Sequence, residues 1–192
     1  MCITLVALSV TGSYAAALVS IDQGPIVRVL RISDVPAGKE GGLPSGALTA
    51  SQLAFNNDPT AATRRAETRA LEGAGFRSSA ITRIDGSGLL QYKSTAVELT
   101  SRAGAARALA AEAPLCAHSQ APTGTRATVA RDPGIRGAIL VTFRASTQGQ
   151  AGGLELLAHS GTYLYTLQAI EEPDGISRLT LERLLKVVMS RR

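Results

Sequence analysis

The chain has two histidines, and His159 adjoins Ser160. A histidine that activates a serine hydroxyl is the arrangement used in acyl transfer. His159 and Ser160 are neighbours, however, and neighbouring side chains of a strand point to opposite faces. No G-x-S-x-G turn surrounds them either. We therefore interpret His159 as a residue of a turn or strand end, without a catalytic role.

The second histidine, His118, lies two residues after Cys116, so both side chains could contact one metal ion. A structural zinc ion needs a tetrahedral set of ligands, and Cys2 is the only other cysteine. The chain has no C-x-x-C motif. The sequence therefore predicts no metal site and no cofactor site. We expect Cys116 to be a small buried residue and His118 to lie in a loop.

Acidic residues and a glycine-rich turn give weaker signals. Glu171 and Glu172 precede Asp174, which we expect at the start of the last helix, where a negative charge is favourable without any catalytic role. A sugar cleft around a carboxylate pair would be lined with aromatic residues, which make up only 4% of the chain. Residues 85–88 (Asp-Gly-Ser-Gly) lack the lysine of a phosphate-binding loop, so we interpret them as a hairpin turn.

Tyr163 and Tyr165 share one face of a predicted strand, because side chains alternate along a strand. Two interpretations remain: the rings line a ligand pocket between sheet and helix, or they form the rim of the core. We favour the rim, since tyrosine usually buries its ring and keeps its hydroxyl hydrated. With the residues above, the sequence predicts no catalytic residue.

The C-terminal part of the chain shows the clearest elements. β-Branched, aromatic and aliphatic residues with short links predict three neighbouring antiparallel strands, at residues 137–145, 153–159 and 162–170. A helix follows over residues 176–190. Its apolar face, which we expect to pack on the sheet, consists of Leu181, Leu184, Leu185 and Val188.

The preceding part predicts a hairpin between two alanine-rich helices. The strands of the hairpin are residues 76–84 and 89–99, and the helices are residues 58–72 and 101–113. Asp58-Pro59 is typical of a helix start. The glycine at 73 or 75 is typical of a helix that ends in the left-handed conformation, and Pro114 is typical of the end of a helix. The predicted packing faces are Ala62, Ala66, Ala70 and Leu71 in the first helix, and Ala103, Ala106, Leu109 and Ala110 in the second. Arg102, Arg107 and Glu112 are expected in water.

Shorter elements complete the order. We predict a short strand or an extended lead-in at residues 25–33, a strand at 125–131, a glycine-rich loop at 38–46 and a short helix at 49–55.

The chain of 192 residues is 45% hydrophobic, enough for one domain with a substantial core. The order of elements predicts an α+β fold: an antiparallel sheet of about five to seven strands with two or three helices, the C-terminal helix packed on one face. We divide it into a signal-like or anchor segment (1–21), a lead-in strand and Gly/Pro-rich loop (22–57) and a single α+β domain (58–192). The net charge of +5 is scattered, which disfavours nucleic acid as a partner.

Residues 1–21 contain no charged residue. An apolar run at 3–10 is followed by three alanines at 15–17, as in the h- and c-regions of a secretory signal. No lysine or arginine precedes the run. A cleaved signal would be complete if the true start of the protein lay upstream of Met1, and two alternatives to a cleaved signal remain. One is an uncleaved membrane anchor of about 20 residues, and the other is a buried N-terminal helix. We expect export, with membrane contact through this segment.

Three short stretches carry a resemblance: residues 32–38 (a D-V-P-A-G opening), residues 97–116 (a strand, an S-x-x-x-A helix and a cysteine) and residues 161–167 (G-T-Y-L-Y-T-L). They resemble secreted actinobacterial envelope proteins, namely lipoproteins of the PsbP-like α+β class and extracellular sensor domains of mycobacterial serine/threonine kinases. The resemblance covers residues 25–190. The chain departs from it because it lacks the cysteine pairs of the sensor domains, and because Cys2 precedes the apolar run instead of following it.

The resemblance implies an exported or membrane-anchored, non-catalytic envelope domain, a sensor or assembly module. Its partner would be an envelope protein, a lipid or a small ligand. A small secreted hydrolase with an unrecognised Ser/Asp/Glu site is the alternative. The first hypothesis predicts no cluster of perturbed titratable groups in a cleft, and the second predicts a nucleophile and a base within hydrogen-bond reach.

Overall fold

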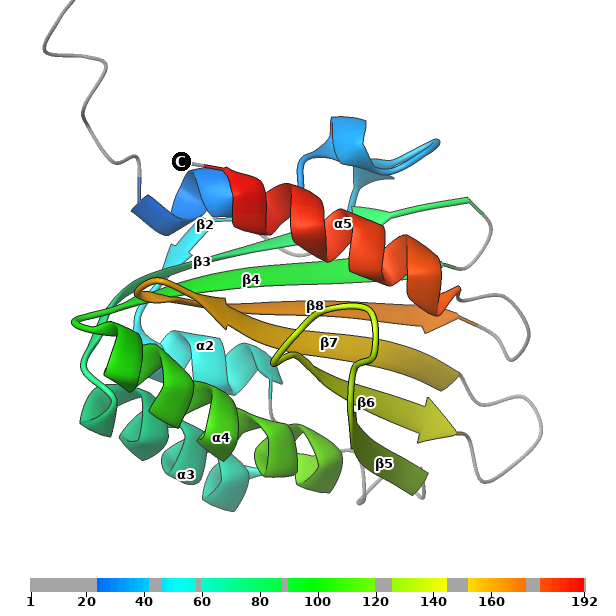
Figure 1. Cartoon of the computed structure of the whole chain (residues 1–192). Helices are drawn as coiled ribbons and strands as arrows, with labels where there is room; N and C mark the ends of the chain where they lie inside the picture. The colour runs from blue at the N-terminus through cyan, green and yellow to red at the C-terminus, as the bar shows by residue number, and fades with distance from the viewer. Residues whose placement is uncertain are drawn as a thin grey trace, which may run out of the picture.

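The structure is a computed structural model, which describes residues 24–41, 46–57, 60–87, 90–119, 126–144, 152–171 and 177–191. The signal-like segment predicted at residues 1–21 lies outside these ranges. Within them, no helix combines the length and the apolar character needed to cross a membrane. Figure 1 shows an antiparallel sheet with helices on both faces.

The described residues form eight strands and four α-helices, which confirms the predicted α+β class. The strands are β1 (Lys39–Glu40), β2 (Gly46–Leu48), β3 (Phe76–Asp85), β4 (Gln91–Leu99), β5 (Arg126–Arg131), β6 (Ile139–Arg144), β7 (Gly152–Ser160) and β8 (Tyr163–Glu171). The helices are α2 (Ala50–Asn57), α3 (Ala61–Gly73), α4 (Arg102–Ser119) and α5 (Arg178–Ser190), with the 3-10 helices η2 (Gly24–Arg28) and η3 (Ile32–Asp34). The strand count exceeds the prediction because β1 and β2 are short strands within or beside the expected glycine-rich loop.

All strand pairs are antiparallel, in the order β1-β3-β4-β8-β7-β6-β5, and β2 also pairs with β3. The predicted hairpin is β3–β4, and the predicted C-terminal strands form the β6–β7–β8 meander. Helix α4 carries the chain from β4 across to the far edge, where β5 begins. The meander then returns, so that β8 pairs with β4 in the middle of the sheet.

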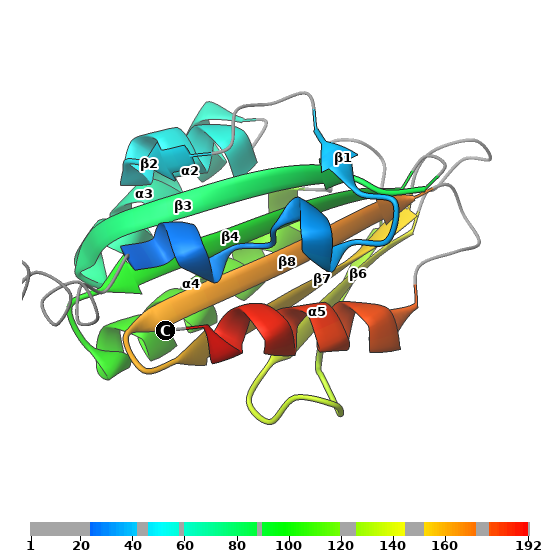
Figure 2. The same ribbon diagram turned by 90° about the horizontal axis from the view of Figure 1, so that it is seen from above.

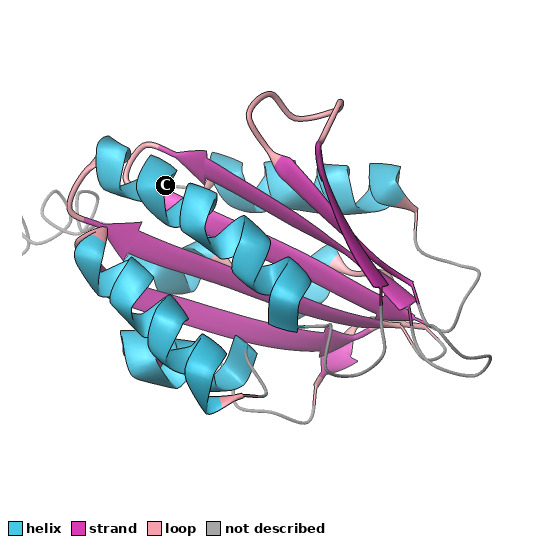
Figure 3. Ribbon diagram, turned by 90° about the horizontal axis from the view of Figure 1, so that it is seen from below, coloured by secondary structure: helices cyan, strands magenta, loops and turns pink. Residues whose placement is uncertain are grey.

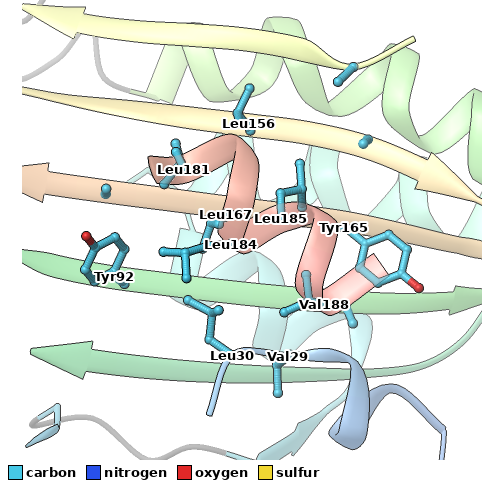
Figure 4. Packing of buried hydrophobic residues seen from close by; sticks show 14 of the residues in the cluster. Val29, Leu30, Tyr92, Leu156, Tyr165, Leu167, Leu181, Leu184, Leu185 and Val188 are labelled. Carbon is cyan, nitrogen blue, oxygen red and sulfur yellow. The ribbon is translucent and has the colours of Figure 1, made fainter. Parts of the chain in front are cut away.

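Helix α5 covers one face of the sheet, as its apolar face predicts (Figure 2). The segment 24–38 lies beside it on the same face. Figure 4 shows the leucines of the helix packed against side chains of the sheet and of this segment. The buried residues that meet here include Leu181, Leu184, Leu185 and Val188 of the helix, Leu156 and Leu167 of the sheet, and Val29 and Leu30 of the segment.

The segment 24–38 is also held by polar contacts to the end of α5. Arg191 Nη2 lies 2.6 Å from both carboxylate oxygens of Asp34, and Arg191 Nη1 donates to the carbonyl of Val29. Arg28 donates to the carbonyl of Arg191. These contacts join the two ends of the described chain across one face of the sheet.

The strand predicted at residues 25–33 is wrong, because these residues form η2 and lead into η3. The backbone of Leu30 is bonded to side chains of the sheet: its N–H donates to Ser94 Oγ at 3.1 Å, and its carbonyl accepts from Thr82 Oγ1 at 3.0 Å. A segment that crosses the face of a sheet can satisfy its backbone in this way without pairing as a strand. The alternation in the sequence therefore reflects burial against the sheet.

Helices α2, α3 and α4 cover the other face (Figures 1 and 3). Helix α3 starts later than predicted, since its N-cap is Thr60, whose Oγ1 accepts from the N–H of Thr63 at 3.2 Å. Asp58 and Pro59, the predicted start, lie outside the described residues. Gly75, with φ of +91°, follows the helix in the left-handed conformation, as expected.

The packing faces predicted for α3 and α4 are largely wrong. Leu71 and Leu109 are buried as expected, but the exposed residues include Ala62, Ala66, Ala103, Ala106 and Ala110. The buried positions are instead Thr63, Glu67 and Leu71 in α3, and Gly104, Ala105, Ala108, Leu109, Glu112 and Ala113 in α4. Because alanine occurs on every side of both helices, its spacing does not identify the side that packs on the sheet.

Helix α4 continues through Pro114, where the sequence predicted its end, to Ser119. A proline inside a helix removes one backbone hydrogen bond to the preceding turn, here to the carbonyl of Ala110. Ala110 and Pro114 are both exposed, so this carbonyl can bond to water. His118 consequently lies in a helix and not in the predicted loop.

Candidate ligand-binding site

A row of four polar residues crosses the sheet on the face covered by α2, α3 and α4. The strand registers pair Arg83 of β3 with Lys93 of β4, Lys93 with Gln168 of β8, and Gln168 with Glu155 of β7. Directly paired residues of antiparallel strands share a face and have adjacent Cβ atoms. We call these four residues the polar row.

The sequence places the row through two hairpins. The Gly86 N–H donates to the carbonyl of Leu90 at 2.8 Å, which closes the turn predicted at residues 85–88 and sets Arg83 opposite Lys93. Gly161, with φ of +57°, allows the tight turn between β7 and β8 that sets Glu155 opposite Gln168. Because a shift by one residue would turn every side chain to the other face, these turns fix the position of the row.

The helices add further polar groups above the row. Lys93 Nζ donates to Asn57 Oδ1 at 3.1 Å, and Asn57 Nδ2 donates to Glu67 Oε1 at 2.6 Å. Glu67 of α3 is only 1% exposed, and Glu112 of α4 and Glu155 of β7 are each 5% exposed. The ammonium group of Lys93 is thus linked through an amide to a buried carboxylate.

Arg83 is less well compensated than Lys93. Its Nη2 donates to the carbonyl of Asn56 at 3.5 Å, and its buried Nε has no acceptor among the described residues. Burial lowers the pKa of the Arg83 guanidinium, because removal from water disfavours the charged form. No carboxylate of the described residues forms an ion pair with it.

One end of the polar row opens into a pocket of about 230 Å³. The pocket lies at the end of the sheet where β3 and β8 finish and β4 begins. Arg83 and Lys93 contribute two cationic groups to its wall, and Asp85 contributes one carboxylate. The complete lining is Gly41, Arg83, Asp85, Gln91, Tyr92, Lys93, Gln168 and Ile170. The buried glutamates do not belong to this lining.

Cys116 of α4 lies within electrostatic reach of the same polar groups. Burial raises the pKa of its thiol well above the ordinary value, the carboxylates of Glu155 and Glu112 raise it further, and Lys93 opposes them. Cys116 and these glutamates do not line the pocket, so the expectation that a binding domain holds no cluster of perturbed titratable groups in a cleft stays a prediction. The raised pKa keeps the thiol protonated, and a thiol is a much weaker nucleophile than a thiolate.

We expect iodoacetamide to alkylate Cys116 slowly at neutral pH, with a rate that rises only well above the pKa of a free cysteine, about 8.5. Since the folded-state pKa is raised, the thiol stabilises the fold below the pKa of the unfolded chain, and this contribution is lost as the pH rises through the folded-state pKa. Cys116→Ala should remove that alkaline loss. Peptide mass spectrometry across pH measures the alkylation, and rapid alkylation at neutral pH would contradict the assignment.

The predicted chemistry-bearing residues do not come together in the described part of the chain. His159 of β7 is half-buried, and its Nδ1 has no hydrogen-bond partner among the described residues. Ser160 is exposed and follows it on the strand. The side chain of His118 lies outside what the structure describes, as do Glu172 and Asp174. No group of three or more described His, Cys, Asp or Glu residues is placed to hold a metal ion.

Tyr163 and Tyr165 lie on the opposite face of β8 from the polar row, in the core beside α5. Their ring centroids are 6.1 Å apart. The guanidinium of Arg28 lies 4.2 Å from the centroid of Tyr163 and donates to the hydroxyl of Tyr165 at 3.5 Å. The rings therefore belong to the core, as favoured from the sequence, but the Tyr165 hydroxyl meets an arginine where water was expected.

The fold and the pocket together define the class of molecule: an antiparallel α+β domain with helices on both faces and a polar pocket at one end of its sheet. The sequence matches no protein-family model and no curated protein.

Two solved structures are similar in outline. The extracellular domain of PknH from Mycobacterium tuberculosis has a TM-score of 0.46 and 11% identity, with 80% of this chain and 82% of that chain covered. A putative uncharacterised protein from Mycobacterium smegmatis, an Rv0999 ortholog, has a TM-score of 0.45 and 16% identity, with 81% and 88% covered.

Proposed function

We propose that this chain is an exported or membrane-anchored, non-catalytic domain of the cell envelope that binds a small polar ligand, as a sensor or assembly module. The observation that carries the proposal is the presence of three residues of the polar row, Arg83, Lys93 and Gln168, in the wall of the 230 Å³ pocket. Convergent charged and amide groups in a concave site are typical of ligand recognition. Lys93 is held by Asn57, which fixes its position before a ligand arrives.

The surroundings of the candidate nucleophiles support binding over hydrolysis. A catalytic hydroxyl or thiol needs a base within hydrogen-bond reach. The hydroxyl of Thr95, on the same face as the row and 2% exposed, has no partner among the described residues. The thiol of Cys116 is kept protonated by its neighbours. Neither environment activates the side chain of Thr95 or Cys116 as a nucleophile.

The location is tested with the full chain carrying a C-terminal reporter. We expect the product outside the cytoplasmic membrane, because residues 1–21 combine an uncharged apolar run with small residues. N-terminal sequencing separates a cleaved signal, with a new terminus near residues 15–17, from a retained anchor. A full-length cytosolic product would contradict the export proposal and favour a buried N-terminal helix.

Ligand binding is tested on the purified full chain by NMR with a panel of small polar compounds. A ligand of the pocket should shift the backbone resonances of Arg83, Lys93 and Gln168, and leave Val129 of the remote strand β5 unchanged. Turnover of an ester or glycoside substrate that is lost on substitution of a pocket residue would overturn the non-catalytic proposal and support the hydrolase.

A further inference from the structure

The pocket contains two cations that face each other. Arg83 and Lys93 are directly paired across β3 and β4, where like charges are destabilising. Lys93 is compensated by Asn57, which itself contacts Glu67. Among the described residues, Arg83 has only one long hydrogen bond, to a neutral carbonyl. An arginine that is partly withdrawn from water normally finds a carboxylate or phosphate partner.

The described protein does not supply that partner. Asp85 lies on the same strand and lines the same pocket, yet it forms no ion pair with Arg83. None of the buried glutamates lines the pocket. An anion that entered the pocket would therefore meet the two cations Arg83 and Lys93 and the single carboxylate of Asp85.

We propose that the pocket binds a small molecule through an anionic group, a carboxylate or a phosphate, held between Arg83 and Lys93. This inference rests on the proposed function and names the chemistry of its ligand. The planar guanidinium can donate paired hydrogen bonds to such a group, and the ammonium acts as a point charge beside it. The side-chain amides of Gln91 and Gln168 line the same wall and can donate to the remainder of the ligand.

The volume limits the size of the ligand. Pockets for drug-sized molecules measure roughly 300–1,000 Å³, so a pocket of about 230 Å³ suits a smaller molecule. Two kinds of ligand could supply such an anionic group within this limit: a free metabolite with a carboxylate or phosphate group, and a lipid headgroup with its phosphate. The test separates these sources.

The test uses the purified full chain and three variants: Arg83→Met, Lys93→Met, and the control Arg77→Met on the same strand, where the side chain is 61% exposed and pairs with Glu98. The probes are inorganic phosphate, succinate, vesicles of phosphatidylcholine with phosphatidylglycerol, spermidine and glucose. Melting temperature and NMR shifts of pocket residues are the readouts. NMR on the unsubstituted chain keeps the test decisive if one variant fails to fold.

We expect phosphate or succinate to shift the resonances of Arg83, Lys93 and Gln168, and both pocket variants to weaken binding at least about tenfold. Without ligand, Arg83→Met should raise the melting temperature by about 2–4 °C, because it removes a poorly compensated charge. Arg77→Met should change neither the anion affinity nor the melting temperature. A merely structural arginine would instead lower the melting temperature when it is replaced. Binding of vesicles but of no free anion would assign the anionic group to a lipid headgroup.

Three results would overturn the inference, and they are distinguishable. If spermidine or glucose shifts the pocket resonances and the anions do not, the anionic ligand is wrong while a binding function stands. If no probe shifts these resonances, the pocket is not a binding site for any of these classes, and both proposals fall. Anion binding that Arg83→Met leaves unchanged would likewise exclude the assigned contact.

Discussion

Leu185→Ala should lower the free energy of unfolding by about 3–4 kcal/mol, within the range of about 2–5 kcal/mol observed for buried leucine substitutions. Leu185 is 0% exposed and lies at the centre of α5, between the helix and the sheet (Figure 4). Its removal loses the transfer free energy of the buried methyl groups and leaves a cavity. Neighbouring side chains come from β7, β8 and segment 24–38, which are fixed by separate hydrogen bonds and cannot all move inward.

Urea unfolding followed by circular dichroism measures this loss. Val187→Ala is the matched control, because Val187 is on the outer side of the same helix and is 37% exposed. It should cost less than about 1 kcal/mol, since little additional apolar area is withdrawn from water there. Similar losses for the two variants would mean that α5 does not pack on the sheet through its leucine face.

The sequence predicted this part of the fold because its signals agree at each level. The strands of the meander have apolar residues at both odd and even positions, as expected for strands that are covered on both faces of the sheet. The helix that follows has polar and apolar residues in separate sectors, so one side alone can pack. Short links then leave antiparallel neighbours as the only simple arrangement. Each of these predictions depended on a contrast between apolar and polar positions that is visible in the sequence.

The same contrast is absent from α3 and α4, and the buried glutamates of these helices were missed for that reason. Their alanines are compatible with burial on any side, so the sequence predicted Arg102, Arg107 and Glu112 alike in water. The structure buries both Glu67, which accepts a hydrogen bond from Asn57 of α2, and Glu112, which lies within electrostatic reach of Cys116. Because no apolar stripe marks the packing face, only the tertiary structure shows which glutamates turn inward.

One signal in the sequence could have located the polar row. Glu155 and Gln168 are polar residues in strands that are rich in apolar residues, and the turn at Gly161 and Thr162, one residue later than predicted, makes them cross-strand partners. In the first hairpin, the connection is residues 86–90 instead of the predicted 85–88, and this connection pairs Arg83 with Lys93. Polar residues that pair across two successive hairpins of a covered sheet indicate an internal polar site, since single buried charges are costly. What the sequence does not contain is the β4–β8 pairing that joins the two halves.

Gly104→Ala should destabilise the chain by about 2 kcal/mol, because α4 crosses the end of α3 at this residue. A Cβ atom on Gly104 would lie 2.2 Å from the carbonyl oxygen of Ala74, which is backbone and cannot rotate away. Overpacking of this kind costs about 1–3 kcal/mol or more. The higher helix propensity of alanine offsets up to about 1 kcal/mol of that loss. The N-cap contact from Gly104 N–H to Ser101 Oγ, at 3.0 Å, would have to shift with the helix.

Gly73→Ala is the matched control for this prediction. Gly73 is exposed at the end of α3, and a Cβ atom there would meet nothing within 4 Å. Alanine should therefore stabilise the chain by about 0.5–1 kcal/mol through its lower backbone entropy in the unfolded state. The two substitutions are chemically identical, so opposite signs in urea unfolding isolate the contact between α3 and α4. A gain in stability for both would show that the two helices do not approach each other at Gly104.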